Sequence, residues 1–110
     1  MVLGLGIDLV DVERVTRMLE RDGQRVTARL LTEGEWAYCS RKALAAEHVA
    51  ARIAAKEAAF KALAGSDGAR AIGWRELEVV HDEHRRPTLA FHGRAADRVQ
   101  ELGVSRALLT

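Results

Sequence analysis

An uninterrupted stretch of helix-forming residues occupies the middle of this chain. The run from Ala43 to Leu63 is rich in alanine and contains neither glycine nor proline, so it predicts one long helix. With about 100° of rotation per residue, four apolar side chains fall on one face of this helix, namely Val49, Ile53, Phe60 and Leu63. That face is the predicted core stripe, against which the rest of the domain packs.

Three charged residues of the same run are placed unusually. Lys56 falls in the middle of the apolar stripe, where its amine must either extend outward or meet a buried acid, for which Asp8 and Asp11 are the candidates. Glu57 and Lys61 lie together at the edge of the stripe. As a solvated pair they would stabilise the helix by only a few tenths of a kcal/mol. We interpret a helix that sets a lysine and a glutamate against its core face as part of a functional site.

A second acid stands in an apolar setting near the N-terminus. Asp8 lies within the run GLGIDLV at residues 4–10, and a carboxylate in such surroundings is costly unless it is paired, hydrogen-bonded or metal-bound. Val2–Val10 is predicted as a strand, whose glycines permit close approach of another backbone or a ligand. Asp8 on a strand and Glu57 on a helix raise the question of which cation they share.

The remaining segments alternate between short helices and strands. The first predicted helix has Asp11 as its cap and runs from Val12 to about Arg21, and a second follows a break at Gly23 as Gln24–Leu31. Thr32 is the predicted cap of a third, with Glu35 completing a capping box, and this helix carries Trp36 and Tyr38 toward Ser40. Gly93–Leu102 is predicted as an amphipathic helix. The predicted strands are Leu77–His81 and Thr88–His92, joined as a hairpin, and Val104–Thr110. No linker divides these elements, so they form one domain.

Arginines recur at steps of three or four residues after the first motif, at Arg14, Arg17, Arg21, Arg25 and Arg29. This spacing predicts a single stripe along a helix. The stripe is either a solvated helix face or a docking surface for an acidic protein, because arginine forks recognise carboxylates well. No aromatic residue is interleaved with it, so a platform for stacking nucleic-acid bases is not indicated.

Composition limits the class of protein. The 110 residues are 48% hydrophobic and 30% charged, as in an ordinary globular domain. The net charge of +1 gives no general attraction to nucleic acid, and no apolar stretch reaches spanning length. The single cysteine, Cys39, cannot form an internal disulfide and fits a reducing compartment. We expect a cytoplasmic protein that binds neither nucleic acid nor membrane.

Three familiar site motifs are absent or incomplete. Gly4-x-Gly6 lacks the third glycine of a dinucleotide fingerprint and lies within the predicted strand. No phosphate-binding P-loop sequence is present. His81 and His84 have metal-like spacing, but they belong to a charged hairpin turn without a third ligand, so we interpret them as part of a solvated turn.

Two segments resemble the signature motifs of a known family. They are GIDLVDVER at residues 6–14 and RIAAKEA at residues 52–58, the latter followed by KAL at 61–63. These are similar to the motifs of the holo-acyl-carrier-protein synthases, the small 4'-phosphopantetheinyl transferases of fatty-acid synthesis. The spacing of the motifs and a later Arg86-Pro87 extend the resemblance over essentially the whole chain. The family implies an α+β fold, with a small antiparallel sheet packed with a long helix, that assembles as a homotrimer with active sites at subunit interfaces.

The resemblance also implies a reaction and roles for individual residues. Coenzyme A would lose its 4'-phosphopantetheine arm to a serine of an acyl carrier protein, leaving adenosine 3',5'-bisphosphate. Asp8 and Glu57 would hold Mg²⁺, which suits carboxylates and phosphate oxygens. Glu57, directly or through a water, would accept the serine proton, and Lys61 would balance charge on the departing diphosphate. Arg52 and Gly65 are the implied contacts for coenzyme A.

The same resemblance favours the docking interpretation of the arginine stripe. The acidic recognition helix of the carrier protein would be met by Arg14 with help from Arg17, Arg21 and Arg25. A small-molecule substrate would not need such a stripe.

The chain departs from the family pattern in two places. LAGSDG at residues 63–68 replaces the usual Leu-Gly-x-Gly, and Thr110 comes before the usual Ser-x-Ser-His segment. We therefore expect residues 1–110 to form a single domain that lacks its C-terminal strand. Two alternative functions stay open: a catalytically inactive trimeric binding module of the same fold, and a Mg²⁺-dependent small-molecule phosphotransferase.

Overall fold

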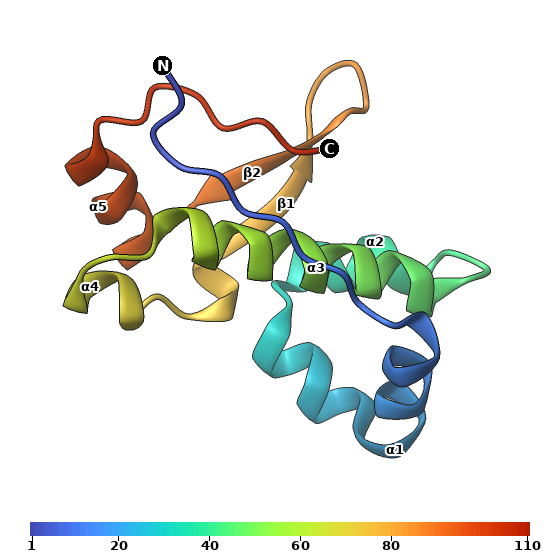
Figure 1. Ribbon diagram of the computed structural model, residues 1–110. Helices are drawn as coiled ribbons and strands as arrows, with labels where there is room; N and C mark the ends of the chain where they lie inside the picture. Colours follow the sequence, from blue (N-terminus) through green and yellow to red (C-terminus); the bar gives the residue numbers. More distant parts are fainter.

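Helix α3 (Ala45–Leu63) runs through the middle of the molecule, and the other elements are arranged around it (Figure 1). The computed structural model describes all residues from Met1 to Thr110. The other elements are α1 (Val12–Leu30), α2 (Glu33–Ser40), α4 (Asp67–Arg70), the 3-10 helix η1 (Trp74–Glu76), β1 (Leu77–His81), β2 (Pro87–Phe91) and α5 (Gly93–Leu102). Helices α1 and α2 and strand β1 contact α3 directly. The combination of helices with a two-stranded antiparallel sheet confirms the predicted α+β class.

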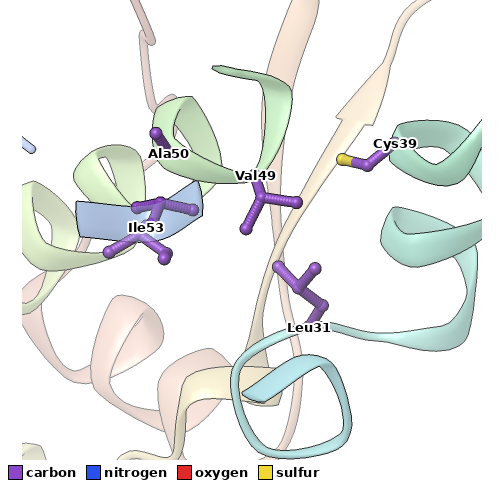
Figure 2. Close-up of a cluster of buried hydrophobic side chains, with 6 residues drawn as sticks. Leu31, Cys39, Val49, Ala50 and Ile53 are labelled. Carbon is purple, nitrogen blue, oxygen red and sulfur yellow. The ribbon is translucent and has the colours of Figure 1, made fainter. Parts of the chain in front are cut away.

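The predicted central helix is confirmed, although it begins two residues later than expected. Its N-terminal half contributes to one buried cluster, shown in Figure 2 and made of Val15, Leu31, Cys39, Val49, Ala50 and Ile53. Its C-terminal half contributes to a second, made of Ala59, Leu63, Ile72, Leu77 and Ala95. Although α3 is rich in alanine, neither it nor any other helix has the length and hydropathy of a membrane-spanning segment.

Cys39 belongs to the first of these clusters. Its side chain has no solvent exposure, and Figure 2 shows its sulfur pointing toward Val49. Burial raises the pKa of the Cys39 thiol above its ordinary value, although the nearby charge of Arg52 acts in the opposite direction. The residue therefore serves as a small apolar core side chain rather than as a nucleophile.

Local signals set where α1 begins and bends. Asp11 caps the helix by accepting a hydrogen bond from the backbone N–H of Glu13 at 3.0 Å, as predicted. The break predicted at Gly23 falls one residue earlier, at Asp22, whose φ of −142° and ψ of 41° are not helical. The helix resumes directly afterwards, so α1 is one bent helix that continues to Leu30.

The C-terminal half of the chain contains the predicted hairpin. Strands β1 and β2 pair in register from Leu77 opposite Phe91 to His81 opposite Pro87, so β2 begins one residue before its predicted start. Asp82 closes the turn, because its carboxylate accepts hydrogen bonds from the backbone N–H groups of residues 84 and 86. Helix α5 has the predicted bounds, whereas the short helix α4 was not predicted.

Neither terminal segment forms the strand predicted for it. Val2–Val10 and Val104–Thr110 have no hydrogen-bonded strand partner, and the sheet contains only β1 and β2. An alternating sequence favours an extended backbone, but a strand also needs the edge of another strand. Both segments instead line an apolar groove of about 1190 Å³ beside α3.

Glu78 on β1 connects the start of α2 with the segment before α5. Its Oε2 accepts a hydrogen bond from the Thr32 hydroxyl at 2.7 Å, and its Oε1 lies 2.9 Å from His92 Nε2. Thr32 also forms the predicted capping box with Glu35. Burial alone would raise the pKa of Glu78, but the hydrogen bonds from Thr32 and His92 outweigh it and hold that pKa below its ordinary value.

This pKa gives a testable pH dependence. A carboxylate with a lower pKa in the folded state stabilises the fold above its unfolded pKa, and the contribution disappears as pH falls through the folded value. Between about pH 6 and pH 3, the wild type should lose about 1 kcal/mol more of its free energy of unfolding than Glu78→Gln. Urea titrations across this range measure the difference. Glu20→Gln, a change at an exposed glutamate of α1, should keep the wild-type slope, and an unchanged slope in Glu78→Gln would contradict the assignment.

Candidate functional site

The acid of the N-terminal segment meets a lysine of α3. Lys61 Nζ donates hydrogen bonds to Asp8 Oδ1 at 3.0 Å and to the Ile7 carbonyl at 2.8 Å. The Asp8 side chain is 19% exposed and that of Lys61 is 55% exposed, so the pair lies at the surface and is within reach of a ligand. The two segments that resemble family motifs are therefore brought together by the fold.

Asp8 and Glu57 line one cavity of about 820 Å³ between the N-terminal segment, α1, α3 and Trp74. The charged side chains of its lining are Asp8, Asp11, Asp22, Glu57, Arg14, Arg25 and Arg29. Its apolar wall includes Ile53 of α3 and Met18 of α1. Carboxylates and guanidinium groups around one cavity can hold a cation and a phosphorylated ligand together.

The carboxylates of this cavity fit Mg²⁺ as it is used with phosphorylated substrates. No three His, Cys, Asp or Glu side chains gather into a group that could enclose a metal ion on its own. Mg²⁺ usually keeps several waters and binds through one or two carboxylates plus substrate phosphates. Asp8 and Glu57, with Lys61 beside Asp8, provide such an incomplete ligand set.

The bend in α1 divides the predicted arginine stripe. The arginines that line the cavity come from both sides of the bend and are Arg14, Arg25 and Arg29. Arg17 and Arg21 lie outside the cavity, and all five side chains are exposed. One continuous stripe would require helical dihedrals throughout, and Asp22 interrupts them. The guanidinium groups therefore form a rim at the cavity and an outer pair along the first half of α1.

Arg52 lies apart from the Asp8–Glu57 cavity, in a cationic cluster around Tyr38. Its side chain is 5% exposed, its Nη1 donates to the His48 carbonyl at 3.1 Å, and its guanidinium lies 4.5 Å from the Tyr38 ring centroid. Lys42 Nζ lies 4.6 Å from the same centroid, and the His81 ring 4.6 Å. Burial and the charges of Arg52 and Lys42 lower the pKa of His81. No sequence signal pointed to this cluster, because its members come from separate elements.

Gly65 follows α3 in a conformation that favours glycine, with a φ of 115°. The turn that carries it is held by Arg98 of α5, whose Nε donates to the Leu63 carbonyl at 2.8 Å and whose Nη2 donates to the Ala64 carbonyl at 3.0 Å. Although the local sequence departs from the family pattern, a glycine with positive φ is present directly after the helix.

The buried acid that meets Lys56 is Glu35, and neither Asp8 nor Asp11 takes this role. Lys56 Nζ lies 2.6 Å from Glu35 Oε1, and neither side chain is exposed. The same ammonium donates to the Leu30 carbonyl at 2.6 Å. Of the two possibilities predicted for Lys56, an outward path for its amine or a buried acid, the structure shows the buried acid. The acids predicted as candidates were wrong, because Asp8 pairs with Lys61 instead.

Both the sequence and the fold have relatives among known proteins. A family model of the 4'-phosphopantetheinyl transferase superfamily matches residues 4–108. Over 110 residues the chain is 46% identical to the holo-[acyl-carrier-protein] synthase of Koribacter versatilis (strain Ellin345), which covers 100% of this chain and 87% of that protein. The crystal structure of holo-[acyl-carrier-protein] synthase from Neisseria meningitidis has a TM-score of 0.81 at 28% identity, covering 96% of this chain and 84% of that one. A holo-(acyl-carrier-protein) synthase from Bacillus anthracis str. Ames, in complex with CoA (3',5'-ADP), has a TM-score of 0.70 at 32% identity, covering 84% and 78%.

Proposed function

Because the chain belongs to the holo-[acyl-carrier-protein] synthases of the 4'-phosphopantetheinyl transferase superfamily, we propose that it transfers 4'-phosphopantetheine from coenzyme A to a serine of an apo acyl carrier protein. The reaction would depend on Mg²⁺ and release adenosine 3',5'-bisphosphate. The observation that carries this proposal is the meeting of Asp8 and Glu57 at one cavity, with Lys61 paired to Asp8 at 3.0 Å.

Asp8 and Glu57 are the proposed ligands of Mg²⁺. The bound ion would neutralise charge on the diphosphate of coenzyme A, which is the main requirement of a phosphoryl transfer. Lys61 is 55% exposed while it contacts Asp8, so its ammonium can also reach a phosphoryl oxygen. We propose that it balances the negative charge that develops on the leaving group.

Glu57 is the proposed general base. The serine oxygen forms a bond to the phosphorus that carries pantetheine, and the bond from that phosphorus to the bridging oxygen of the diphosphate breaks. Adenosine 3',5'-bisphosphate leaves with this oxygen and the electron pair. The serine proton passes to the Glu57 carboxylate, directly or through a water.

The cationic cluster around Tyr38 is the proposed contact for the nucleotide end of coenzyme A. Arg52 Nε is buried and has no hydrogen-bond partner, so a small shift of the guanidinium that brought it to a phosphate oxygen would satisfy a donor that is otherwise unpaired. Lys42 contributes a second positive charge beside the same ring. Gly65 lies at the end of α3, one turn beyond Lys61, where its backbone can approach the pantetheine phosphate without a side chain in between.

The exposed arginines of α1 are the proposed docking surface for the carrier protein. Arg14 and Arg25 lie at the cavity rim, with Arg17 and Arg21 continuing the positive surface away from it. An acidic helix placed along this surface would bring its serine toward Asp8 and Glu57. Charge complementarity of this kind mainly increases the association rate and selects the partner.

Charge reversal tests the docking surface. Arg14→Glu or Arg21→Glu should raise the KM for the carrier protein about tenfold or more while leaving the KM for coenzyme A near the wild-type value. The effect should shrink with added salt, because exposed charges are screened over about 10 Å at 0.1 M ionic strength. Arg70→Glu, the same change at an exposed arginine of α4, is the control. An equal rise in KM for both substrates would instead place these arginines in the coenzyme A site or in the support of the fold.

We propose that the chain assembles as a homotrimer through its terminal segments. Leu5, Ile7 and Leu9 are 75%, 72% and 93% exposed, and the groove beside α3 is lined mainly by apolar residues of both termini. Extended segments without strand partners and with exposed apolar side chains favour association.

Sedimentation velocity tests this assembly. The wild type should sediment as a trimer at micromolar concentration, and Leu5→Glu should shift it to monomer, because a charge would have to be buried in the contact. Leu44→Glu is the matched control, since Leu44 is 62% exposed at the start of α3 and lies outside this groove. A wild-type monomer with full activity would contradict the proposal.

Mass spectrometry of an apo acyl carrier protein tests the function itself. Incubation with the protein, coenzyme A and Mg²⁺ should add one phosphopantetheine group to the carrier, and omission of coenzyme A or addition of a chelator should prevent it. An inactive binding module would bind coenzyme A and leave the carrier unmodified. A small-molecule phosphotransferase would also leave the carrier unmodified, and it would leave coenzyme A intact. Either of these results would contradict the proposed reaction.

A further inference from the structure

The N-terminal segment rests directly on the backbone of α3 at two glycines. A Cβ atom at Gly6 would lie 1.8 Å from the carbonyl oxygen of Ala58, and one at Gly4 would lie 2.4 Å from that of Ala62. Real Cβ atoms essentially never come closer than 3.0 Å to such an atom. Figure 1 shows the segment, in blue, running along α3, in green. The close contact is therefore possible only without a side chain at these two positions.

The two glycines match the spacing of the helix. Alternate residues of an extended chain are roughly 6.6 Å apart, and residues four apart in a helix are separated by about 6 Å along its axis. Gly6 faces Ala58 and Gly4 faces Ala62, so the segment runs antiparallel to α3 with one contact per helical turn. The next step of this register is Asp8 opposite Ala54, and these two residues line the same groove.

The same register decides which way Asp8 points. Residues at even positions, Gly4, Gly6 and Asp8, turn toward α3, whereas the odd positions carry the exposed side chains of Leu5, Ile7 and Leu9. A shift by one residue would turn Asp8 away from the helix and present an apolar side chain in its place. The contacts at the glycines and the direction of the carboxylate are therefore one geometric constraint.

Few hydrogen bonds hold the segment. The hydrogen bonds that tie residues 1–10 to the rest of the chain are the two donated by Lys61, to Ile7 and to Asp8. With alanine at position 6, the segment would have to move away from α3 by more than an ångström to restore an ordinary contact. That movement is enough to separate Asp8 from Lys61, because their polar contact is only 3.0 Å long.

We propose that Gly6 and Gly4 are positioning residues, which dock the N-terminal segment on α3 and thereby fix Asp8 against Lys61 and beside Glu57. In its consequence for metal binding, this inference rests on the proposed function. The docking itself does not depend on it. An error of about 1 Å in the placement of a catalytic group can cost on the order of 10²-fold in rate.

Amine labelling tests the docking, because the three lysines of the chain report on three different properties. Lys61 reports on the docked segment, the buried Lys56 reports on unfolding, and the exposed Lys42 is the reference. In Gly6→Ala, labelling of Lys61 relative to Lys42 should rise by up to about fivefold, the factor that corresponds to the loss of a partly exposed ion pair. Lys56 should stay unlabelled.

Two further variants keep this test decisive. Gly23→Ala is the matched control, since a Cβ at Gly23 would meet nothing within 4 Å, and its labelling should equal that of the wild type. Gly4→Ala has the smaller overlap and should raise labelling of Lys61 less than Gly6→Ala does. If Gly6→Ala exposes Lys56, the comparison is made with Gly4→Ala. Unchanged labelling of Lys61 in a folded glycine variant overturns the proposal.

Metal binding separates the docking from the proposed function. Mn²⁺, used as a paramagnetic probe for the Mg²⁺ site, should bind Gly6→Ala 10- to 100-fold more weakly, as is usual when the support of a ligand is lost. Asp8→Asn should show a similar loss. If labelling of Lys61 rises in Gly6→Ala while both variants bind Mn²⁺ as the wild type does, the docking stands and the assignment of Asp8 as a metal ligand falls.

Discussion

Replacing Lys56 with methionine is expected to lower the free energy of unfolding by about 3–5 kcal/mol. Methionine has a similar length, but it leaves the carboxylate of Glu35 without a counter-charge at a position with no solvent exposure. It also removes the hydrogen bond to the Leu30 carbonyl at the end of α1. Since a domain has roughly 5–15 kcal/mol of stability in total, this loss is a large fraction. Urea unfolding followed by circular dichroism measures it.

Lys42→Met is the matched control for this prediction. Lys42 is exposed, and its ammonium contacts only the face of Tyr38 at 4.6 Å. Loss of such a contact should cost no more than about 1 kcal/mol. A Lys56→Met protein as stable as Lys42→Met would show that the buried pair contributes little to the fold.

Replacing both Lys56 and Glu35 with uncharged residues should restore part of the free energy of unfolding that Lys56→Met loses. Burial lowers the pKa of Lys56 although the hydrogen bond and charge of Glu35 oppose this shift, so desolvation is the larger effect on the ammonium. Removing both charges also removes that penalty. Recovery should stay incomplete, because Glu35 additionally accepts hydrogen bonds from the backbone N–H groups of Thr32 at 2.8 Å and Val79 at 2.9 Å.

This pair shows what sequence periodicity could and could not predict. The position of Lys56 within an apolar stripe left two possibilities, an outward path for its amine or a buried acid, and the structure shows the second. The choice among acids depended on tertiary neighbours, which periodicity does not contain. Glu35 was predicted only as the second member of the capping box with Thr32, and that local role is confirmed. The carboxylate of Glu35 both completes the cap of α2 and pairs with Lys56. Because the capping role already explained this glutamate, the sequence offered no reason to assign it a second partner.

The terminal segments show the same limit for strands. In the segment predicted as a strand, Leu5, Ile7 and Leu9 are exposed while the glycines face inward. The glycines were predicted to permit close approach of another backbone, and that backbone belongs to α3 rather than to a second strand. Strand pairing depends on residues far away in the sequence, whereas helices, caps and the hairpin depend on neighbours. Apart from the short helices α4 and η1, which were not predicted, the bounds of the helices and of the hairpin strands were accordingly predicted within one or two residues.

Some residues of the candidate site were predicted and others were not, again because tertiary neighbours are not contained in a local pattern. The resemblance of the two motifs brought Asp8 and Glu57 together, and the structure places both at one cavity. The arginine stripe was predicted from helical spacing alone, although a break at Gly23 was predicted within the same stretch. The observed bend at Asp22 divides the stripe, and Arg14, Arg25 and Arg29 line the cavity. Helical spacing also could not show that the side chain of Arg52 packs against Tyr38, apart from that cavity.

Asp8→Asn and Glu57→Gln are each expected to lower the rate of phosphopantetheine transfer on the order of 10²-fold or more. The amides nearly keep the shape of the acids but remove the negative oxygen that would bind Mg²⁺. Glu57→Gln also removes the proposed proton acceptor, so it should lose at least as much as Asp8→Asn. Both proteins should fold, because the Asp8–Lys61 pair is partly exposed and such pairs contribute no more than about 1 kcal/mol.

Asp11→Asn is the control that isolates the metal from the general charge of the cavity. Asp11 lines the same cavity, and asparagine can replace aspartate as the cap of α1. If Asp8 and Glu57 act as ligands, Asp11→Asn should keep a rate close to that of the wild type, and its dependence on Mg²⁺ concentration should be unchanged. If the three acids act only through their summed charge, all three variants should lose activity to a similar extent. Near-normal Mg²⁺-dependent turnover in both Asp8→Asn and Glu57→Gln would rule out the proposed ligand pair, because no third acid gathers with them to take over the ion.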